Sequence, residues 1–139
     1  MGKPVLIDSG PLVAALRERD RHHAWAGAHL AAMRDPCITC EAVISECFHL
    51  LEGAPEGAER LCELLDEGVI QIAFEADGCL TDLLRLLRSY RNLPMGFADA
   101  CLVRMSELQP DARIFTTDTD FRIYRRNGRQ VIPLIAPWQ

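Results

Sequence analysis

The sequence predicts a three-layer α/β/α sandwich with a short-stranded, mainly parallel central sheet. Short apolar segments alternate with helix-forming segments along the whole chain. This alternation is typical of βαβ units, which place helices on both faces of a parallel sheet. The chain has 139 residues, of which 49% are hydrophobic and 25% charged. Length and composition fit one globular domain, and we predict a single domain over residues 1–139.

The first strand is expected at residues 4–7, and Asp8 follows its end. Ser9 is a residue type suited to an N-cap and Pro11 is tolerated in a first turn, so a helix is expected to follow as far as about Arg19. Pro94 and Gly96 indicate a break late in the chain. Further helices are expected at about 22–33, 41–51, 56–66, 77–90 and 97–107. Further strands are expected at 37–39, 69–74, 112–116 and, at a sheet edge, 131–134.

The six cysteines give no clear metal or disulfide pattern. Cys37 and Cys40 form a C-x-x-C motif, but no second C-x-x-C pair completes a zinc site. We therefore expect reduced, mostly buried thiols. Apolar runs such as Val5-Leu6-Ile7 are far too short to cross a membrane. The N-terminus has no export signal, so a cytoplasmic location is expected.

The net charge of −5 argues weakly against nucleic-acid binding, but it hides the distribution of the basic residues. Almost all of these are arginines, which suit bidentate contacts with phosphate. They occur in three groups: Arg17, Arg19 and Arg21; Arg85, Arg88 and Arg91; and Arg122, Arg125, Arg126 and Arg129. Each group has two readings, a phosphate-binding surface or an ordinary solvated helix face.

Four acidic residues occupy positions where acids are unusual. Asp8 and Asp118 follow predicted strands, and in parallel α/β sheets the carboxyl ends of the strands form the binding edge. Glu46 is spaced with Val43 and Leu50 along the apolar stripe of its predicted helix. Asp99 lies three and four residues before Leu102 and Val103, and so also points along an apolar face. A buried, unpaired carboxylate is costly, and such a group must be paired, protonated or bound to a cation.

Each acid except Glu46 also has a simple structural explanation. Asp8 could cap the first helix together with Ser9, and Asp99 could complement the dipole of its helix from the first turn. Asp118 could be a turn residue. Glu46 is expected in the middle of a helix without a neighbouring basic partner, so its structural explanation is the weakest.

Taken together, the four acids favour a metal site. Converging carboxylates repel one another, and a hard divalent cation such as Mg²⁺ or Mn²⁺ resolves this repulsion. Such a cation can activate water and neutralise charge on a phosphate under attack. The four histidines form no clear triad with a serine or cysteine, and this chemistry requires none.

Four short motifs, in this order, resemble the PIN domain family, most closely the VapC-type toxins of toxin–antitoxin pairs. The motifs are D-S-G at 8–10, I-S-E at 44–46, L-P-M-G-F-A-D-A at 93–100 and T-T-D-T-D-F at 116–121. The resemblance implies a metal-dependent endoribonuclease that is a homodimer, acts on RNA and is inhibited by a cognate antitoxin protein. It implies that the core acids are Asp8, Glu46, Asp99 and Asp118.

The same resemblance extends to residues around these acids. Asp120 is implied as a fifth acid behind the metal ligands, and Ser9, Thr116 and Thr117 as polar residues beside the metal. Among the arginine groups, Arg122, Arg125, Arg126 and Arg129 are our first choice for RNA contacts because they closely follow Asp118.

Other classes fit less well. A haloacid-dehalogenase-like phosphatase needs an aspartate where Gly10 stands. For a receiver domain, Asp8 comes too early, and no G-x-G-x-x-G motif follows the first strand as a dinucleotide enzyme requires. The alternative that remains open is a PIN-like scaffold that acts by partner binding without nuclease activity.

Overall fold

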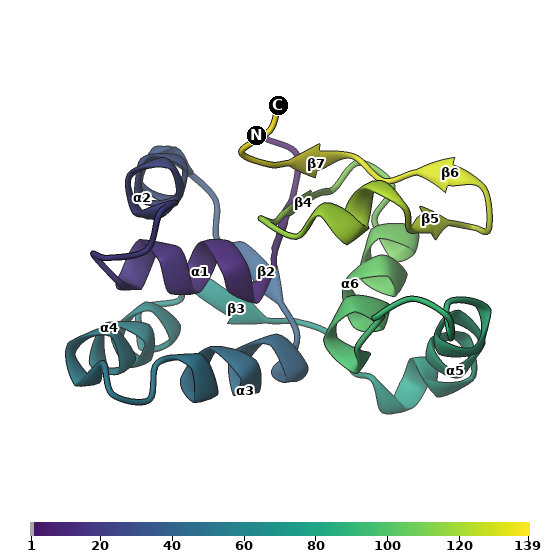
Figure 1. The fold of residues 1–139 in the computed structure, drawn as a ribbon, viewed down its shortest axis with the longest axis horizontal. Helices are drawn as coiled ribbons and strands as arrows, with labels where there is room; N and C mark the ends of the chain where they lie inside the picture. Colours follow the sequence, from purple (N-terminus) through teal and green to yellow (C-terminus); the bar gives the residue numbers. More distant parts are fainter. Residues whose placement is uncertain (1) are drawn as a thin grey trace.

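The computed structural model describes residues 2–139 and has the predicted sandwich architecture (Figure 1). The central sheet contains β1 (Val5–Ile7), β2 (Cys37–Thr39), β3 (Ile70–Ile72), β4 (Arg113–Phe115) and β7 (Leu134–Ile135). All neighbouring strands in this sheet are parallel, and their order is β3-β2-β1-β4-β7. The strand β1 is therefore central, and its three residues are all buried.

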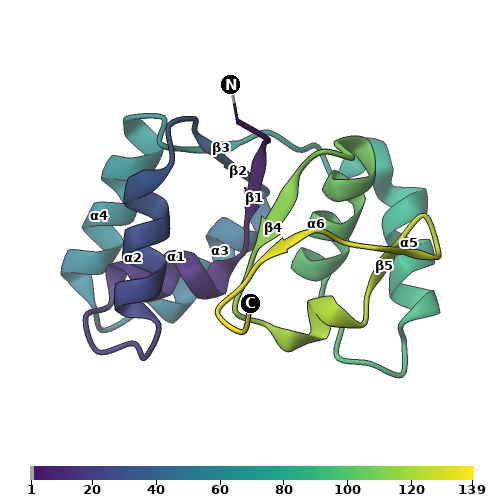
Figure 2. The ribbon, with the colours of Figure 1, turned by 90° about the horizontal axis from the view of Figure 1, so that it is seen from above.

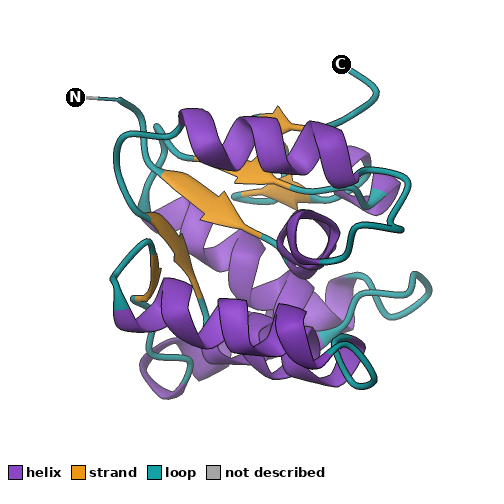
Figure 3. Ribbon diagram, turned by 90° about the vertical axis from the view of Figure 1, so that its left-hand side faces the viewer, coloured by secondary structure: helices purple, strands orange, loops and turns teal. Residues whose placement is uncertain are grey.

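Six helices cover the sheet. They are α1 (Ser9–Leu16), α2 (His23–Ala32), α3 (Glu41–Leu50), α4 (Pro55–Asp66), α5 (Leu80–Ser89) and α6 (Phe97–Leu108). Figure 2 shows α1, α2 and α4 on one side of the sheet and α5 and α6 on the other. Figure 3 shows the strands enclosed between helical layers. The helix α3 contacts both α1 and α6, so it connects the two helical layers at one end of the molecule.

The first helix begins and ends differently from the prediction. Its N-cap is Asp8, not Ser9, because the Asp8 carboxylate accepts a hydrogen bond from the Ser9 backbone N–H. The helix ends at Leu16, and Arg17 is already extended. Residues 17–19 and His22 were expected to be helical but lie in the turn between α1 and α2, where Asp20 accepts a hydrogen bond from the His22 N–H.

The C-terminal segment also differs from the prediction. The single strand expected at 131–134 is divided, because Pro133 has no N–H for a strand ladder. On one side β6 (Gln130–Val131) forms an antiparallel hairpin with β5 (Arg125–Arg126), and on the other side β7 joins β4. Asn127 and Gly128 both have positive φ at the hairpin turn, as this dipeptide favours.

Smaller corrections concern β3 and the segment before α5. The strand β3 is shorter than the predicted 69–74, and the predicted helix at 77–90 begins as a 3₁₀ turn, η1 (Asp77–Cys79). All six cysteines are unpaired in the structure. Four of them are buried, which agrees with the expectation of mostly buried thiols. No helix within residues 2–139 has the length and apolar character needed to span a membrane.

Candidate active site

The order in which the strands are added to the sheet reverses between the neighbouring strands β1 and β4. From β1 the sheet extends to β2 and β3 on one side, and to β4 and β7 on the other. Asp8 directly follows β1, and its N–H donates a 3.0 Å hydrogen bond to the carbonyl of Phe115, the last residue of β4. Ligands of open α/β sheets bind at such a switch point, beyond the carboxyl ends of the strands.

Asp8 is held by two hydrogen bonds and is almost fully buried, with 6% of its surface exposed. Its Oδ1 accepts from the Ser9 N–H at 2.8 Å, and its Oδ2 accepts from the Thr116 hydroxyl at 2.7 Å. Burial raises the pKa of Asp8 to about 7. The two hydrogen bonds oppose this rise, and the nearby charges of Asp99 and Glu46 add to it.

Thr116 connects the two strand ends. While donating to Asp8, its hydroxyl oxygen accepts a 3.0 Å hydrogen bond from the Asp118 N–H. Asp118 is in turn the N-cap of the 3₁₀ turn η2 (Thr119–Arg122), and its Oδ1 accepts from the Asp120 N–H at 2.9 Å. Asp118 is therefore a turn residue, which was its simple structural explanation from the sequence. It is only partly exposed.

Asp99 lies in the first turn of α6, and its Oδ2 accepts a 2.9 Å hydrogen bond from the Gly96 N–H. Burial raises the pKa of Asp99 to about 6, and the charges of Asp118, Glu46 and Asp120 raise it further against the effect of the Gly96 hydrogen bond. Burial and the charge of Asp118 also raise the pKa of Asp120. The acids are thus close enough to disfavour one another's ionisation.

The prediction that Glu46 points along a buried apolar stripe is wrong. Glu46 is exposed, and so is Leu50, which shares its face of α3. The buried face of α3 is formed by Val43, Ile44 and Cys47 instead. Glu46 nevertheless reaches the site from the rim, because its Oε1 accepts a 2.8 Å hydrogen bond from the Ser9 hydroxyl.

The four predicted core acids line one cavity of about 410 Å³, together with the predicted polar residues Ser9 and Thr117. Thr116 and Asp120 do not line it, but each is hydrogen-bonded to an acid that does, Thr116 to Asp8 and Asp120 to Asp118. Sequence reasoning missed the contributions of Gly10, Leu50 and Phe97 to the lining. Gly10 could have been found from the D-S-G motif, because a side chain at this position would collide with the Thr117 hydroxyl.

Tyr124 is a second residue that the sequence did not indicate. Its side chain is fully buried, and its hydroxyl has no hydrogen-bond partner among the described residues. Burial raises its pKa, and the charges of Asp99, Asp120 and Asp118 raise it further. The phenol therefore lies near the acids, behind the cavity.

The four carboxylates of the cavity offer oxygen ligands, which hard divalent cations such as Mg²⁺ and Mn²⁺ prefer. They come from four separate segments. Burial is the main cause of the raised pKa values of Asp8 and Asp99, the charges of the neighbouring acids add to it, and a bound cation would offset both effects. Within residues 2–139, however, no three His, Cys, Asp or Glu side chains are close enough together to hold an ion. An ion held directly by three of these side chains would therefore require them to move closer together, whereas one or two carboxylates can hold Mg²⁺ together with water.

The four predicted RNA-contacting arginines do not line the cavity and fall into two kinds. The Arg125 guanidinium donates to the carbonyls of residues 122, 123 and 124, and the Arg126 guanidinium donates to those of Ser106 and Pro110. Arg122 and Arg129 are exposed, and the Arg122 guanidinium lies 5.9 Å from the centre of the Trp138 ring. RNA contact by this group stays a prediction.

The sequence matches the PIN domain family over residues 5–127, a range that contains all four acids of the cavity. The chain belongs to the PIN domain family. Its fold is also similar to the crystal structure of VapC20 from Mycobacterium tuberculosis, a sarcin–ricin loop cleaving toxin. The TM-score is 0.76 and the identity 17%, and the match covers 93% of this PIN domain chain and 99% of VapC20. No curated protein sequence matches the chain.

Proposed function

We propose that this PIN domain is a metal-dependent endoribonuclease of the VapC type, the toxin of a type II toxin–antitoxin pair. One observation carries the proposal. Carboxylates from the end of β1, from α3, from the first turn of α6 and from the turn after β4 line a single cavity at the sheet's switch point. The similarity in fold to a ribonuclease toxin supports the same function.

In the proposed reaction Asp8, Glu46, Asp99 and Asp118 would hold Mg²⁺ or Mn²⁺. A cation bound there would act as a Lewis acid, which would activate water and neutralise charge on the phosphodiester. The protein positions its ligands through hydrogen bonds: Thr116 fixes Asp8, and Ser9 fixes Glu46. Products with 5′-phosphate and 3′-hydroxyl ends are expected from the family resemblance.

The substrate is proposed only as RNA. VapC20 is a sarcin–ricin loop cleaving toxin, but it is only 17% identical to this chain, so the same RNA target is not proposed here. Homodimerisation, inhibition by a cognate antitoxin and a cytoplasmic location belong to the same proposal. They rest on the VapC-like character of the chain.

The test is cleavage of end-labelled total cellular RNA by the purified, antitoxin-free protein with Mg²⁺, with Mn²⁺ and with EDTA. We expect discrete cuts that require metal and disappear in Asp99→Asn. Asp111→Asn is the matched control, because Asp111 is exposed and lies outside the cavity. If folded, metal-loaded protein cuts no RNA, the proposal fails in favour of a scaffold that acts by partner binding. If Asp99→Asn cuts as well as Asp111→Asn, the cleavage does not come from this cavity and the proposed site is wrong.

A further inference from the structure

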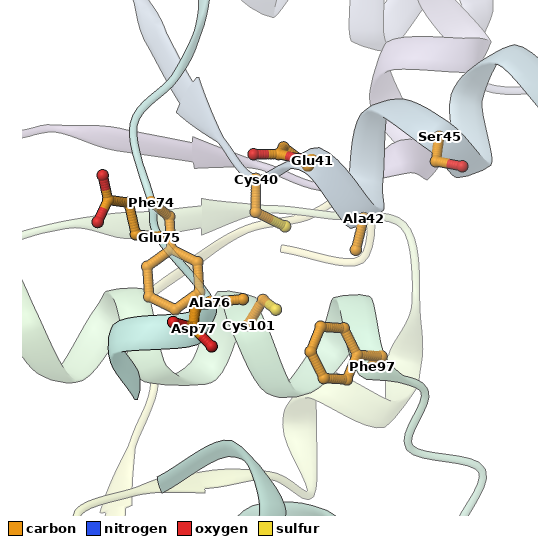
Figure 4. Close-up of a pocket in the computed structure, with 10 residues that line it drawn as sticks. All are labelled: Cys40, Glu41, Ala42, Ser45, Phe74, Glu75, Ala76, Asp77, Phe97 and Cys101. Atoms are coloured by element: carbon orange, nitrogen blue, oxygen red, sulfur yellow. The ribbon is translucent and has the colours of Figure 1, made fainter. Parts of the chain in front are cut away.

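A second cavity, of about 570 Å³, lies next to the acid-lined one. The two share Phe97 in their linings. Two cysteines line the second cavity, Cys40 at the N-cap of α3 and Cys101 within α6. Figure 4 shows both side chains at this cavity between the two helices, with Phe74 and Phe97 beside them. The two thiols are buried in the packed structure but have access to solvent-filled space through this cavity.

Figure 4 shows the two side chains close together in the lining of this cavity, Cys40 from the beginning of α3 and Cys101 from α6. The neighbouring Cys101 thiol lowers the pKa of Cys40 against the effect of burial. The backbone N–H groups of Val43 and Ala42 at the beginning of α3 lower it further. Burial instead raises the pKa of Cys37 to about 11 and that of Cys47 to about 12.

We infer that Cys40 and Cys101 form an oxidation site, at which hydrogen peroxide or a similar small peroxide produces an intramolecular disulfide. The cavity, of about 570 Å³, is large enough to hold an oxidant of this size beside both cysteines. The other cysteines lack this combination of a thiol partner and a shared cavity. Cys62 is exposed on α4, and it lines neither this cavity nor the acid-lined one.

The chemistry balances in two steps. The Cys40 thiolate attacks one peroxide oxygen, the O–O bond breaks, hydroxide leaves, and Cys40 becomes a sulfenic acid. The Cys101 sulfur then attacks the Cys40 sulfur, the S–O bond breaks, and water leaves with the thiol proton. One peroxide is reduced and two thiols are oxidised. A dithiol reductant reverses the change by thiol–disulfide exchange.

The disulfide would connect the two helices that carry Glu46 and Asp99. Cys40 lies directly before α3, and Cys101 lies two residues after Asp99 on α6. A cation held directly by three of the carboxylates requires them to move closer together, and a covalent link between α3 and α6 would restrict this movement. Slower RNA cleavage by the oxidised protein is therefore expected. This consequence rests on the proposed ribonuclease function, whereas the disulfide itself does not.

The experiment treats the purified wild-type chain with dilute hydrogen peroxide and maps its peptides by mass spectrometry without reduction. We expect a cross-linked pair of peptides containing Cys40 and Cys101, lighter by two hydrogens than the separate peptides and separated again by dithiothreitol. Cys62→Ser should form the same link, and Cys40→Ser should not. Because the wild-type map needs no variant to fold, an unstable Cys40→Ser leaves the result interpretable.

Two outcomes would overturn the inference. One is a map in which Cys40 and Cys101 remain free thiols after Cys62 has been oxidised. The other is a link between Cys40 and a different cysteine. Cleavage of RNA is measured separately on the reduced and oxidised protein. A disulfide in a protein that cleaves no RNA in either state would retain the oxidation site and reject only the ribonuclease function.

Discussion

The Thr116 hydroxyl donates a 2.7 Å hydrogen bond to Oδ2 of Asp8 and so joins two residues that are 108 positions apart in the sequence. Both residues directly follow adjacent parallel strands, whose last residues, Ile7 and Phe115, are paired in register. The sheet register therefore fixes the separation of these two side chains. The same hydroxyl accepts from the Asp118 N–H, so one threonine orients the acids that follow β1 and β4.

Replacing this hydroxyl by a methyl group in Thr116→Val should destabilise the protein. It removes a hydrogen bond to a buried carboxylate and leaves the Asp118 N–H without its acceptor, at a cost of about 1–3 kcal/mol. Urea denaturation of the metal-free protein at neutral pH measures the loss. Thr119→Val is the control, because Thr119 is exposed and makes neither bond. Equal denaturation midpoints for the two variants would contradict this account.

The pKa values of Asp8 and Asp99 predict a pH dependence of stability in the absence of metal. Both are raised above the ordinary value of 3.8, to about 7 and about 6, so the folded state binds these protons more tightly than the unfolded state. Their contribution to stability is fully present below about pH 4 and is lost as the pH rises through the folded pKa values.

The free energy of unfolding should therefore fall between about pH 4 and 7 in EDTA, relative to Asp8→Asn, which cannot ionise at this position. Chemical denaturation at several pH values in this range gives the slope of the unfolding free energy against pH for the wild type and for Asp8→Asn. Asp111→Asn, an exposed substitution of the same kind, should keep the wild-type slope. The prediction is wrong if Asp8→Asn and Asp111→Asn have the same dependence on pH.

Much of the fold could be predicted because short apolar strands and longer helical segments differ clearly along this chain. The C-terminal strands could not be predicted from apolar residues alone. Pro133 interrupts the segment, and the hairpin depends on the positive φ angles of Asn127 and Gly128. The Asn-Gly dipeptide was the available signal for this hairpin.

The site could be predicted to the extent that it follows from strand ends. Asp8 reaches the cavity because it directly follows β1, and Asp118 reaches it from the segment that follows β4. Glu46 shows the limit of helical spacing. Its neighbour Leu50 is 42% exposed, since which edge of α3 is covered depends on how α3 packs against α1 and α6. The spacing of apolar residues within one helix contains no information about that packing.

Gly10 is needed for the close contact between α1 and the loop after β4. A Cβ at this position would collide with the Thr117 hydroxyl, so Gly10→Ala should rotate Thr117 away from the cavity and slow RNA cleavage. Gly27→Ala is the matched control. Its Cβ meets nothing within 4 Å, and alanine in a helix should stabilise the protein by up to about 1 kcal/mol.

A double-mutant cycle tests the origin of the Gly10 effect. Truncation of the colliding side chain in Thr117→Ala should relieve the collision, giving a favourable coupling of about 0.5–3 kcal/mol with Gly10→Ala in denaturation experiments. Additive effects of the two substitutions would show that the Gly10 position acts through something other than Thr117.

Asp118 and Asp120 should differ in their importance for cleavage, although they are two residues apart. Asp118 lines the cavity, whereas Asp120 does not and donates its N–H to Asp118. Asp120→Asn retains that N–H and should reduce the cleavage rate by no more than about 10–100-fold, the usual range for a residue behind a metal ligand. Asp118→Asn should reduce it more under the same metal concentration. The opposite ranking would place the metal nearer Asp120.

The arginines after Asp118 should separate into stability and RNA-binding residues. Arg126 donates to the carbonyls of Ser106 and Pro110, so Arg126→Ala removes structural contacts and should lower the midpoint of thermal unfolding. Arg129 is exposed. If it contacts an RNA phosphate, Arg129→Ala should leave the unfolding midpoint unchanged and reduce the slope of log binding constant against log salt by about one.

Binding to a non-cleaved RNA, measured with Asp99→Asn protein at several salt concentrations, gives these slopes. Using the inactive variant keeps the RNA intact during titration. Arg34→Ala provides the comparison, because Arg34 lines a separate cavity formed around residues 2–3, 29–36 and 113. An equal salt slope for Arg34→Ala and Arg129→Ala would exclude a specific phosphate contact at Arg129. Because Arg125 and Arg126 use their guanidinium groups on backbone carbonyls, Arg122 would then be the remaining exposed candidate of this group.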